Sequence, residues 1–264
     1  MTQTSPIQGF VPVLTLRFPL DALLRPYVER LSPAALISVP ELQHRRDGTL
    51  PDLPLMIDSG GYAALQPGAQ VSRRGGLGIL TLADGRQITP RDVHAEQERH
   101  AHTGFTLDFP CPDQLGAEER ARRLDLGLAN ARWALRQPRR FQLYACVQPG
   151  QAAAPFLALE PDGLALGGLA PHSRDRGRIH DAVREVRQQM PAGMPLHVFG
   201  IGHPDSLRAV FAAGATSADS SACQRLAADG RSWQGEALSD PAPHERLRFA
   251  LHNLLAATEA GARP

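Results

Sequence analysis

The feature that most constrains this chain is the regular alternation of short apolar runs with longer segments of helical periodicity. Short apolar runs bounded by turn-forming residues are typical of buried strands, whereas apolar residues three and four apart are typical of amphipathic helices. Eight such strands alternating with helices predict an α/β protein with a (β/α)8 barrel of the TIM type. The predicted strands are Phe10–Leu16, Ala34–Val39, Leu53–Ile57, Phe105–Leu107, Gln142–Val147, Leu164–Leu166, Leu196–Phe199 and Thr216–Ala218.

The segments between these strands carry helix signals. Thr89 as an N-cap, followed by Pro90 in the first turn, predicts the start of a helix that ends at Gly104. A doubly wound sheet with three layers fits the same alternation and is the alternative architecture. The other predicted helices are Leu20–Leu31, Ala117–Arg136, Ile179–Met190, Pro204–Ala213 and His244–Glu259.

The length of 264 residues suits one large domain, which we predict to span residues 1–264. A β-hairpin insertion is predicted near residues 75–88, because Asp84-Gly85 separates the runs Gly78–Leu82 and Arg86–Ile88. An Asp-Gly pair between two such runs is a strong signal for a tight hairpin turn.

The composition argues against several classes of protein. The 28 basic and 27 acidic residues nearly balance, so no global field points to a nucleic acid or a membrane. No apolar run approaches the roughly 18 residues of a membrane span, and the polar segment Met1–Gln8 does not resemble a signal peptide. We therefore expect a soluble, cytoplasmic protein without a membrane partner.

Metal and cofactor sites are not expected either. The three cysteines are dispersed along the chain, which favours a reducing compartment and argues against a cysteine-rich zinc site. On a helix, His94 and His102 lie about 80° apart and His100 points elsewhere, so these histidines do not converge.

Polar residues collect where the predicted strands end. The stretch Asp58-Ser59-Gly60-Gly61-Tyr62 follows one strand, and Asp108, Gln148, Gly168, Gly200 and Asp219 follow others. Any one of these could be a local turn or capping residue. In a barrel, however, the carboxyl ends of the strands form one mouth, where active sites lie. Such a pocket suits a purine like guanine, because a carboxylate accepts both donors of its edge and an aromatic ring covers its face.

These stretches together resemble the tRNA-guanine transglycosylase superfamily. The residues from Asp58 to Tyr62 are similar to its DSGGF/Y motif, and those from Leu166 to Ala170 match GGLA. Further similar stretches, in the same order as in the family, are Asp84-Gly85 with Thr89-Pro90, Leu107–Pro112, Cys146–Gly150, Phe199–Asp205 and Ala218–Arg225.

The resemblance implies a base-exchange reaction. Asp219 would be the nucleophile on the nucleoside C1′, and Asp58 the general acid/base that handles the proton of the base. Guanine would leave, a covalent glycosyl-aspartate would form, and a 7-deazaguanine base would replace it. The predicted substrate-binding residues are Ser59, Gly61, Tyr62, Asp108, Gln148, Gly168, Leu169, Phe199, Gly200 and Arg225, with Tyr62 and Phe199 on the two faces of the base.

The resemblance also bears on partners. The family's zinc subdomain, built on a CxCxxC motif, is not found in this sequence, so we expect the barrel without it. Within the resemblance, the tRNA-modifying enzymes carry this subdomain, so we expect DNA rather than tRNA as the polymer. The candidate partners are a protein from a modification cluster and a second copy of the chain, in a homodimer. Three alternatives stay open: a tRNA-modifying enzyme of the queuosine or archaeosine type, a non-catalytic nucleobase- or nucleic-acid-binding barrel, and an unrelated barrel enzyme.

Overall fold

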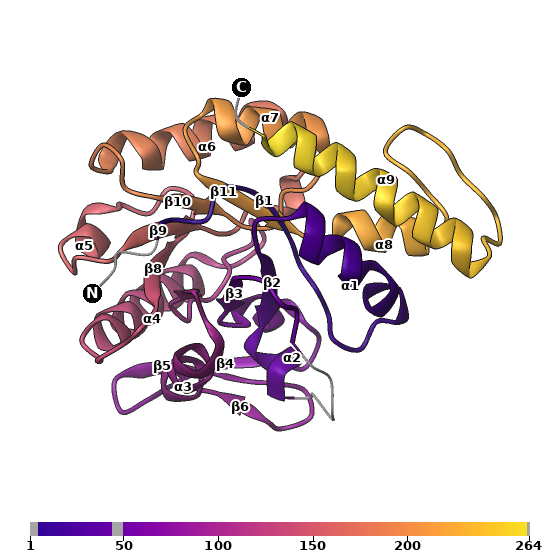
Figure 1. Cartoon of the computed structure of the whole chain (residues 1–264). Coiled ribbons are helices and arrows are strands. Elements are labelled where there is room, and N and C mark those ends of the chain that lie inside the picture. The colour runs from indigo at the N-terminus through magenta and orange to yellow at the C-terminus, as the bar shows by residue number, and fades with distance from the viewer. Residues whose placement is uncertain (1–4, 44–49, 263–264) are drawn as a thin grey trace.

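Eight parallel strands form the centre of the computed structural model, which describes residues 5–43 and 50–262 (Figure 1). The strand order is β1-β11-β10-β9-β8-β7-β3-β2. A parallel bridge between Val13 and Leu36 joins the first and last strands, and the Leu14 N–H donates to the Leu36 carbonyl at 2.9 Å. The sheet thus closes into the predicted (β/α)8 barrel. Its strands are β1 Gly9–Pro12, β2 Ala35–Ser38, β3 Leu55–Asp58, β7 Thr103–Phe105, β8 Gln142–Val147, β9 Gly163–Leu166, β10 Leu196–Val198 and β11 Ser217–Ser220.

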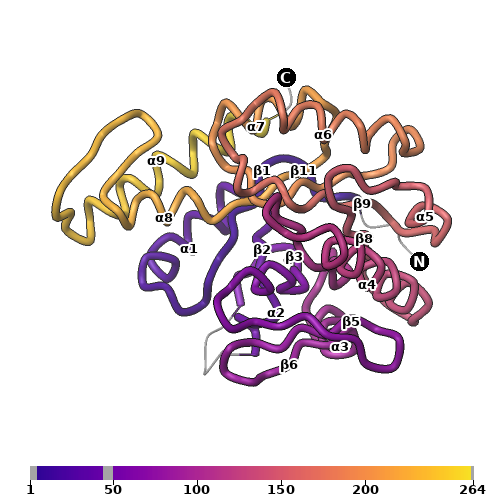
Figure 2. The backbone as a smooth tube through the Cα atoms, turned by 180° about the vertical axis from the view of Figure 1, so that it is seen from behind, coloured from indigo at the N-terminus to yellow at the C-terminus, as the bar shows by residue number. Residues whose placement is uncertain are grey.

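Helices surround the barrel. Figure 2 shows from behind that α6 and α7 lie on one side of the strands, with α3 on the opposite side. The predicted helices are found with small shifts, and the short helices α2, α5 and α8 were not predicted. The helices are α1 Pro19–Leu31, α2 Val39–Gln43, α3 Pro90–His100, α4 Ala117–Leu135, α5 Ala154–Leu157, α6 Arg176–Gln189, α7 Pro204–Ala212, α8 Ala222–Ala228 and α9 Pro243–Gly261, with 3-10 turns η1 Gly61–Leu65 and η2 Ala170–His172.

The boundary between α3 and β7 differs from the prediction. The helix begins at Pro90 with the predicted Thr89 cap, but it ends at His100, and Gly104 lies inside the strand. A Cβ atom at Gly104 would lie 2.7 Å from the Gln97 side chain, so this glycine allows the helix to pack closely on the strand. The regular strand then stops at Phe105, because the Cys146 N–H donates to the Thr106 hydroxyl at 2.9 Å and not to a backbone carbonyl of the neighbouring strand.

The predicted hairpin insertion is larger than expected. It is a three-stranded antiparallel sheet of β4 Gln70–Arg74, β5 Leu77–Thr81 and β6 Gln87–Ile88, and it therefore begins before residue 75. The first strand was missed because its side chains are mostly exposed and show no apolar alternation. Asn130 of α4 attaches the sheet to the barrel: its side chain binds both backbone groups of Gly78 and the Leu107 carbonyl.

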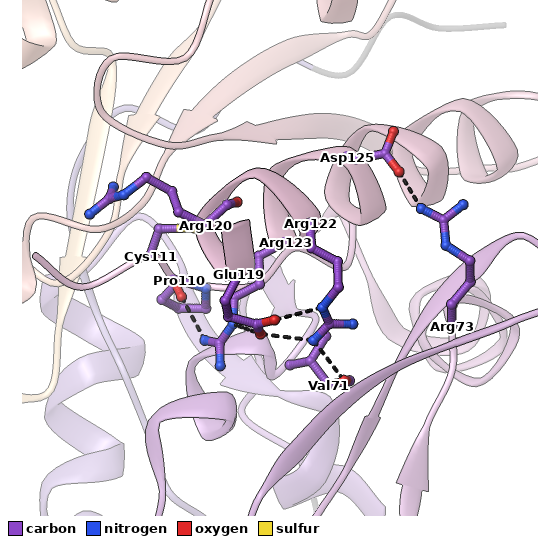
Figure 3. A network of polar contacts seen from close by, with 9 residues as sticks. All are labelled: Val71, Arg73, Pro110, Cys111, Glu119, Arg120, Arg122, Arg123 and Asp125. Atoms are coloured by element: carbon purple, nitrogen blue, oxygen red, sulfur yellow. Dashed lines mark hydrogen bonds and ion pairs between the residues drawn. The ribbon is translucent and has the colours of Figure 1, made fainter. Parts of the chain in front are cut away.

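Arginines at the start of α4 strengthen the same attachment (Figure 3). Arg122 and Arg123 both bind Glu119, and these contacts lower the pKa of Glu119 to about 2, the hydrogen bond from Arg122 contributing most. Arg122 also donates to the Val71 carbonyl of β4, and Arg123 to the Pro110 carbonyl. Arg122 and Arg123 thus link the sheet to the segment that follows Asp108.

The core fills the barrel and the layer between strands and helices. Phe10, Phe105, Tyr144, Phe156 and Phe249 are among its largest fully buried side chains. Within the described part of the chain, no helix is long and apolar enough to cross a membrane.

Candidate active site

A cavity of about 750 Å³ opens at the C-terminal ends of the barrel strands. Its wall includes the last residues of β2, β3 and β11 and the residues just after β8, β9 and β10. The structure thus brings together polar side chains that are far apart in the sequence. The predicted site residues that line it are Asp58, Tyr62, Asp108, Gln148, Gly168, Phe199, Gly200, Asp219 and Arg225.

Three predicted residues lie just behind this wall. Ser59 and Leu169 are almost completely buried, at 1% and 0% exposure, and Gly61 is buried as well. The Ser59 hydroxyl accepts from the Gly61 N–H at 3.4 Å. A Cβ atom at Gly61 would overlap the Asp108 carbonyl oxygen, so a glycine is needed here for close approach of two backbone segments. These residues support the wall rather than form it.

Asp58 is the last residue of β3. Its Oδ2 accepts from the Gly60 N–H at 3.0 Å, which is possible because Gly60 adopts a left-handed conformation with φ of 84°. Burial raises the pKa of Asp58 to about 7, against the Gly60 hydrogen bond, and the charges of Asp219 and Asp108 raise it further. A carboxyl group with this pKa can both donate and accept a proton near neutral pH.

Asp108 and Gln148 form a pair in the cavity wall. The Gln148 amide nitrogen donates to Asp108 Oδ2 at 2.5 Å, and burial raises the pKa of Asp108 to about 6 although this bond opposes the change. Gln148 Oε1 is buried and has no hydrogen-bond partner among the described residues. In the structure the Gln148 amide thus orients the Asp108 carboxylate.

The β9 loop passes close to this pair. A Cβ atom on Gly168 would lie 2.6 Å from Gln148 Oε1, and its φ of 74° also favours glycine. The wall beside Asp108 is therefore formed by bare backbone. Together, a carboxylate, an amide and an accessible peptide group make a surface that suits a flat heterocycle with hydrogen-bonding edges.

Asp219 lies on β11 and is only 5% exposed. Its Oδ1 is 3.0 Å from His197 Nε2 and accepts from the Gly200 N–H at 3.3 Å. His197 Nδ1 lies 2.9 Å from the Ser217 hydroxyl. Sequence analysis missed His197 and Ser217. Strand alternation places Ser217 and Asp219 on one face of β11 and was the signal that could have found Ser217.

Tyr62 and Phe199 are the two lining aromatic residues that the resemblance assigns to the base, and Trp233 lines the cavity as well. Phe199 follows β10, and its ring packs against Phe105 and His197 with centroid distances of 4.8 Å to each. Tyr62 lies in the 3-10 turn after Asp58 and is 59% exposed. A packed ring and a freely accessible ring can both cover the face of a base.

Arginines surround the opening. Arg17 pairs with Glu41 and Arg86 with Asp84, whereas the guanidinium groups of Arg174 and Arg225 have no hydrogen bond or ion pair within the described ranges 5–43 and 50–262. Unpaired guanidinium groups at a cavity mouth suit phosphate groups of a ligand.

No group of three or more histidine, cysteine or acidic residues is placed to hold a metal ion in the part of the chain that the structure describes. His94, His100 and His102 bind different partners: the Pro138 carbonyl, Glu96 and the Ser5 carbonyl. The three cysteines are free and buried.

One protein-family model matches most of this barrel, including most of the strand ends that form the cavity. The model for queuine tRNA-ribosyltransferase matches residues 46–252, a range that contains every predicted site residue. The chain belongs to this family, which confirms the resemblance drawn from the motifs.

Known relatives agree. A queuine tRNA-ribosyltransferase from Aromatoleum aromaticum is 28% identical over 184 residues, which are 62% of this chain and 48% of the relative. The queuine tRNA-ribosyltransferase from Sphingopyxis alaskensis is 26% identical over 220 residues, which are 75% of this chain and 57% of the relative. The one from Solidesulfovibrio magneticus is 29% identical over 181 residues, which are 62% of this chain and 48% of the relative. The chain spans about half the length of the curated relatives it matches.

Proposed function

We propose that this protein is a glycosyltransferase that exchanges guanine in a nucleic acid for a 7-deazaguanine base. The observation that carries the proposal is the convergence of Asp58, Asp108 and Asp219 on one cavity in three different surroundings. Carboxylates whose environments differ can take different chemical roles.

Asp219 and Asp58 are assigned the chemical steps. An Asp219 carboxylate oxygen attacks C1′ of the nucleotide, and the electron pair of the C1′–N9 bond leaves with guanine, which takes a proton from Asp58. In the second half, Asp58 removes the proton from N9 of the incoming base, which attacks C1′ and releases the Asp219 carboxylate. Asp58 must therefore change protonation state in each half-reaction, and its pKa of about 7 supports this role.

Asp108 is assigned to recognition of the base. Its carboxylate accepts hydrogen bonds from the N1-H and amino groups of guanine, while Gln148 and the Gly168 backbone complete the edge. Tyr62 and Phe199 cover the ring. Retention of both Asp58 and Asp219 in the cavity argues against the alternative of a barrel that only binds a nucleobase, because binding alone requires no nucleophile.

The polymer is a separate part of the proposal. The names of the relatives favour tRNA, and the unpaired Arg174 and Arg225 at the cavity mouth support a phosphate-bearing substrate. The preference for DNA that we drew from the sequence stays a prediction, as do a partner protein, a homodimer and a cytoplasmic location. In duplex DNA the base would have to be flipped out at a cost of a few kcal/mol, which is the reason to expect a partner there.

Incorporation of labelled 7-deazaguanine tests the reaction and the polymer together. The purified protein is incubated with tRNA and with duplex DNA, each with and without the products of neighbouring genes. We expect the native protein to incorporate label into one of the two polymers. The control Asp181→Asn, which replaces an exposed carboxylate, should incorporate label in the same way. Asp219→Asn should incorporate no label and form no adduct that survives a denaturing gel.

Three results would contradict the proposal in part or as a whole. Base exchange by Asp219→Asn would assign the nucleophile to another residue, with Asp58 the first candidate. Incorporation into DNA but never into tRNA would reverse the choice of polymer that the relatives favour. No incorporation under any combination would overturn the proposed reaction.

A further inference from the structure

His197 is a fully buried histidine beneath the proposed nucleophile. It lies in the middle of β10, in register with Ser217 of β11, and its ring packs against Phe105 and Phe199. It does not line the cavity, so it cannot touch a substrate there. Its two ring nitrogens nevertheless both have polar partners, Ser217 and Asp219.

The chemistry of these partners fixes the direction of the hydrogen bonds. A carboxylate oxygen can only accept, so Nε2 must carry the proton that it shares with Asp219 Oδ1 at 3.0 Å. In a neutral ring Nδ1 is then an acceptor, and the Ser217 hydroxyl can donate to it at 2.9 Å. Ser217, His197 and Asp219 thus form a directed chain of hydrogen bonds that ends on the nucleophile.

The two oxygens of Asp219 consequently differ. Oδ1 accepts from His197 Nε2 and from the Gly200 N–H, whereas Oδ2 accepts no hydrogen bond from the residues that the structure describes. A carboxylate held by two donors on one oxygen has its rotation about the last side-chain bond restricted. The oxygen without partners is then the one free to approach a ligand.

We propose that His197 is a positioning residue, which holds Asp219 Oδ1 so that Oδ2 is the attacking oxygen. This inference rests on the proposed base exchange. The Oδ2 lone pair forms the bond to C1′, the C1′–N9 electron pair leaves with the base, and Oδ1 becomes the carbonyl oxygen of the ester. His197 keeps its proton throughout. When the incoming base attacks, the ester bond breaks toward Oδ2, and the His197 N–H again stabilises the carboxylate that departs.

Paired substitutions separate this role from simple packing. His197→Leu removes the donor, whereas His197→Gln places an amide N–H near the position of Nε2. Because a misplacement on the order of 1 Å can cost about 100-fold in rate, we expect His197→Leu to lower kcat about 100-fold. We expect the KM for the base to change little, because Asp108 and Gln148 are untouched. His197→Gln should recover most of the lost kcat, and Ser217→Ala should lower kcat less than His197→Leu.

Thermal unfolding and guanine binding serve as controls for each variant. Equal losses of kcat in His197→Leu and His197→Gln, or a kcat of His197→Leu equal to that of the native protein, would overturn the positioning role. A parallel loss of guanine binding in His197→Leu would likewise indicate that the histidine only supports the wall.

Nitrogen-15 NMR of the histidine ring tests the hydrogen bond without any activity. The His197 signals are assigned by their loss in His197→Gln. We expect the proton on Nε2, in slow exchange with water, and a shift of its resonance in Asp219→Asn. A proton on Nδ1 with a bare Nε2 would overturn the inference. If the native protein exchanges no base, the proposed function is wrong, while this spectrum still decides whether His197 donates to Asp219.

Discussion

Asp58, Asp108 and Asp219 share one cavity, and the donors that reach each carboxylate come from different parts of the fold. Asp58 receives a backbone N–H from its own turn, Asp108 an amide from β8's end, and Asp219 a histidine and a glycine N–H. A carboxylate is sensitive to its neighbours, because hydrogen bonds favour the charged form while burial favours the neutral form. Single substitutions should therefore have separable effects on binding, proton transfer and stability.

Asp108→Ala should weaken guanine binding. Charge-assisted hydrogen bonds are worth about 1.5–3 kcal/mol, so the dissociation constant should rise roughly 10- to 150-fold. Titration calorimetry with guanine measures this change. Asp113→Ala, which removes an exposed carboxylate paired with Arg178, is the control and should bind guanine like the native protein. Unchanged affinity in Asp108→Ala would remove Asp108 from the recognition site.

Asp58→Asn should change how stability depends on pH. Burial raises the pKa of Asp58 to about 7, whereas an aspartate in the unfolded chain titrates near 4. The folded state therefore binds this proton more tightly. The stabilisation that this bound proton gives the folded state is fully present below pH about 4 and is lost as the pH rises through about 7. An asparagine has no such loss, so the variant should gain Tm relative to the native protein as the pH increases.

Thermal unfolding between pH 5 and 8 measures the effect. The exposed Asp240→Asn provides the control, for which we expect no trend with pH. A constant Tm difference between Asp58→Asn and the native protein across this range would show that Asp58 titrates as an ordinary carboxyl group.

At the scale of elements, the site depends on close contacts between segments that carry no chemistry themselves. The 3-10 turn η1 packs on the backbone at Asp108, and Asn130 of α4 binds the Leu107 carbonyl just before it. The Asp108 segment is therefore held by the turn on one side and by α4 on the other. This explains how a carboxylate beyond the regular end of β7 keeps a defined position.

Gly61→Ala should disturb this packing. The new methyl group would overlap the Asp108 carbonyl oxygen, and overpacking of this kind costs about 1–3 kcal/mol. We expect a lower urea midpoint together with weaker guanine binding. Gly116→Ala is the matched control, because no atom lies within 4 Å of a Cβ there and its φ is −58°. Native guanine binding by Gly61→Ala would show that the turn does not position Asp108.

At the scale of the whole molecule, the last helix, α9, contacts elements from both the beginning and the end of the chain. The α9 helix packs against α1, α7, α8 and β1, as Figure 1 shows for its crossing of α8. Phe249 on its inner face is fully buried, whereas Leu255 on the same helix is 40% exposed. The barrel shares a main core with this helix.

Phe249→Ala should therefore lower the free energy of unfolding by about 3–5 kcal/mol, because it leaves a cavity in that core. Leu255→Ala, an apolar truncation on the same helix, should change it by less than about 0.5 kcal/mol. Chemical denaturation followed by circular dichroism measures both. Similar effects of the two substitutions would mean that α9 is not part of the main core.

Local patterns in the sequence were sufficient for the barrel, the Asp-Gly turn, most helices and the strand-end acids. Each of these depends on the preferences of residues close together in the chain. The resemblance of the strand-end stretches to a known family identified residues that the structure places around one cavity. The polar, exposed β4 was missed because nothing in its own residues distinguishes it from a loop until it pairs with β5.

Only the tertiary structure decided the partners of the site carboxylates. Gln148 lies 40 residues from Asp108 and His197 lies 22 residues from Asp219, and no periodicity relates residues at such separations. Closure of the barrel brings these strands side by side and largely buries the carboxylates at their ends. The proton affinity of Asp58 and the orientation of Asp219 follow from that burial and from hydrogen bonds across strands, which a linear sequence does not contain.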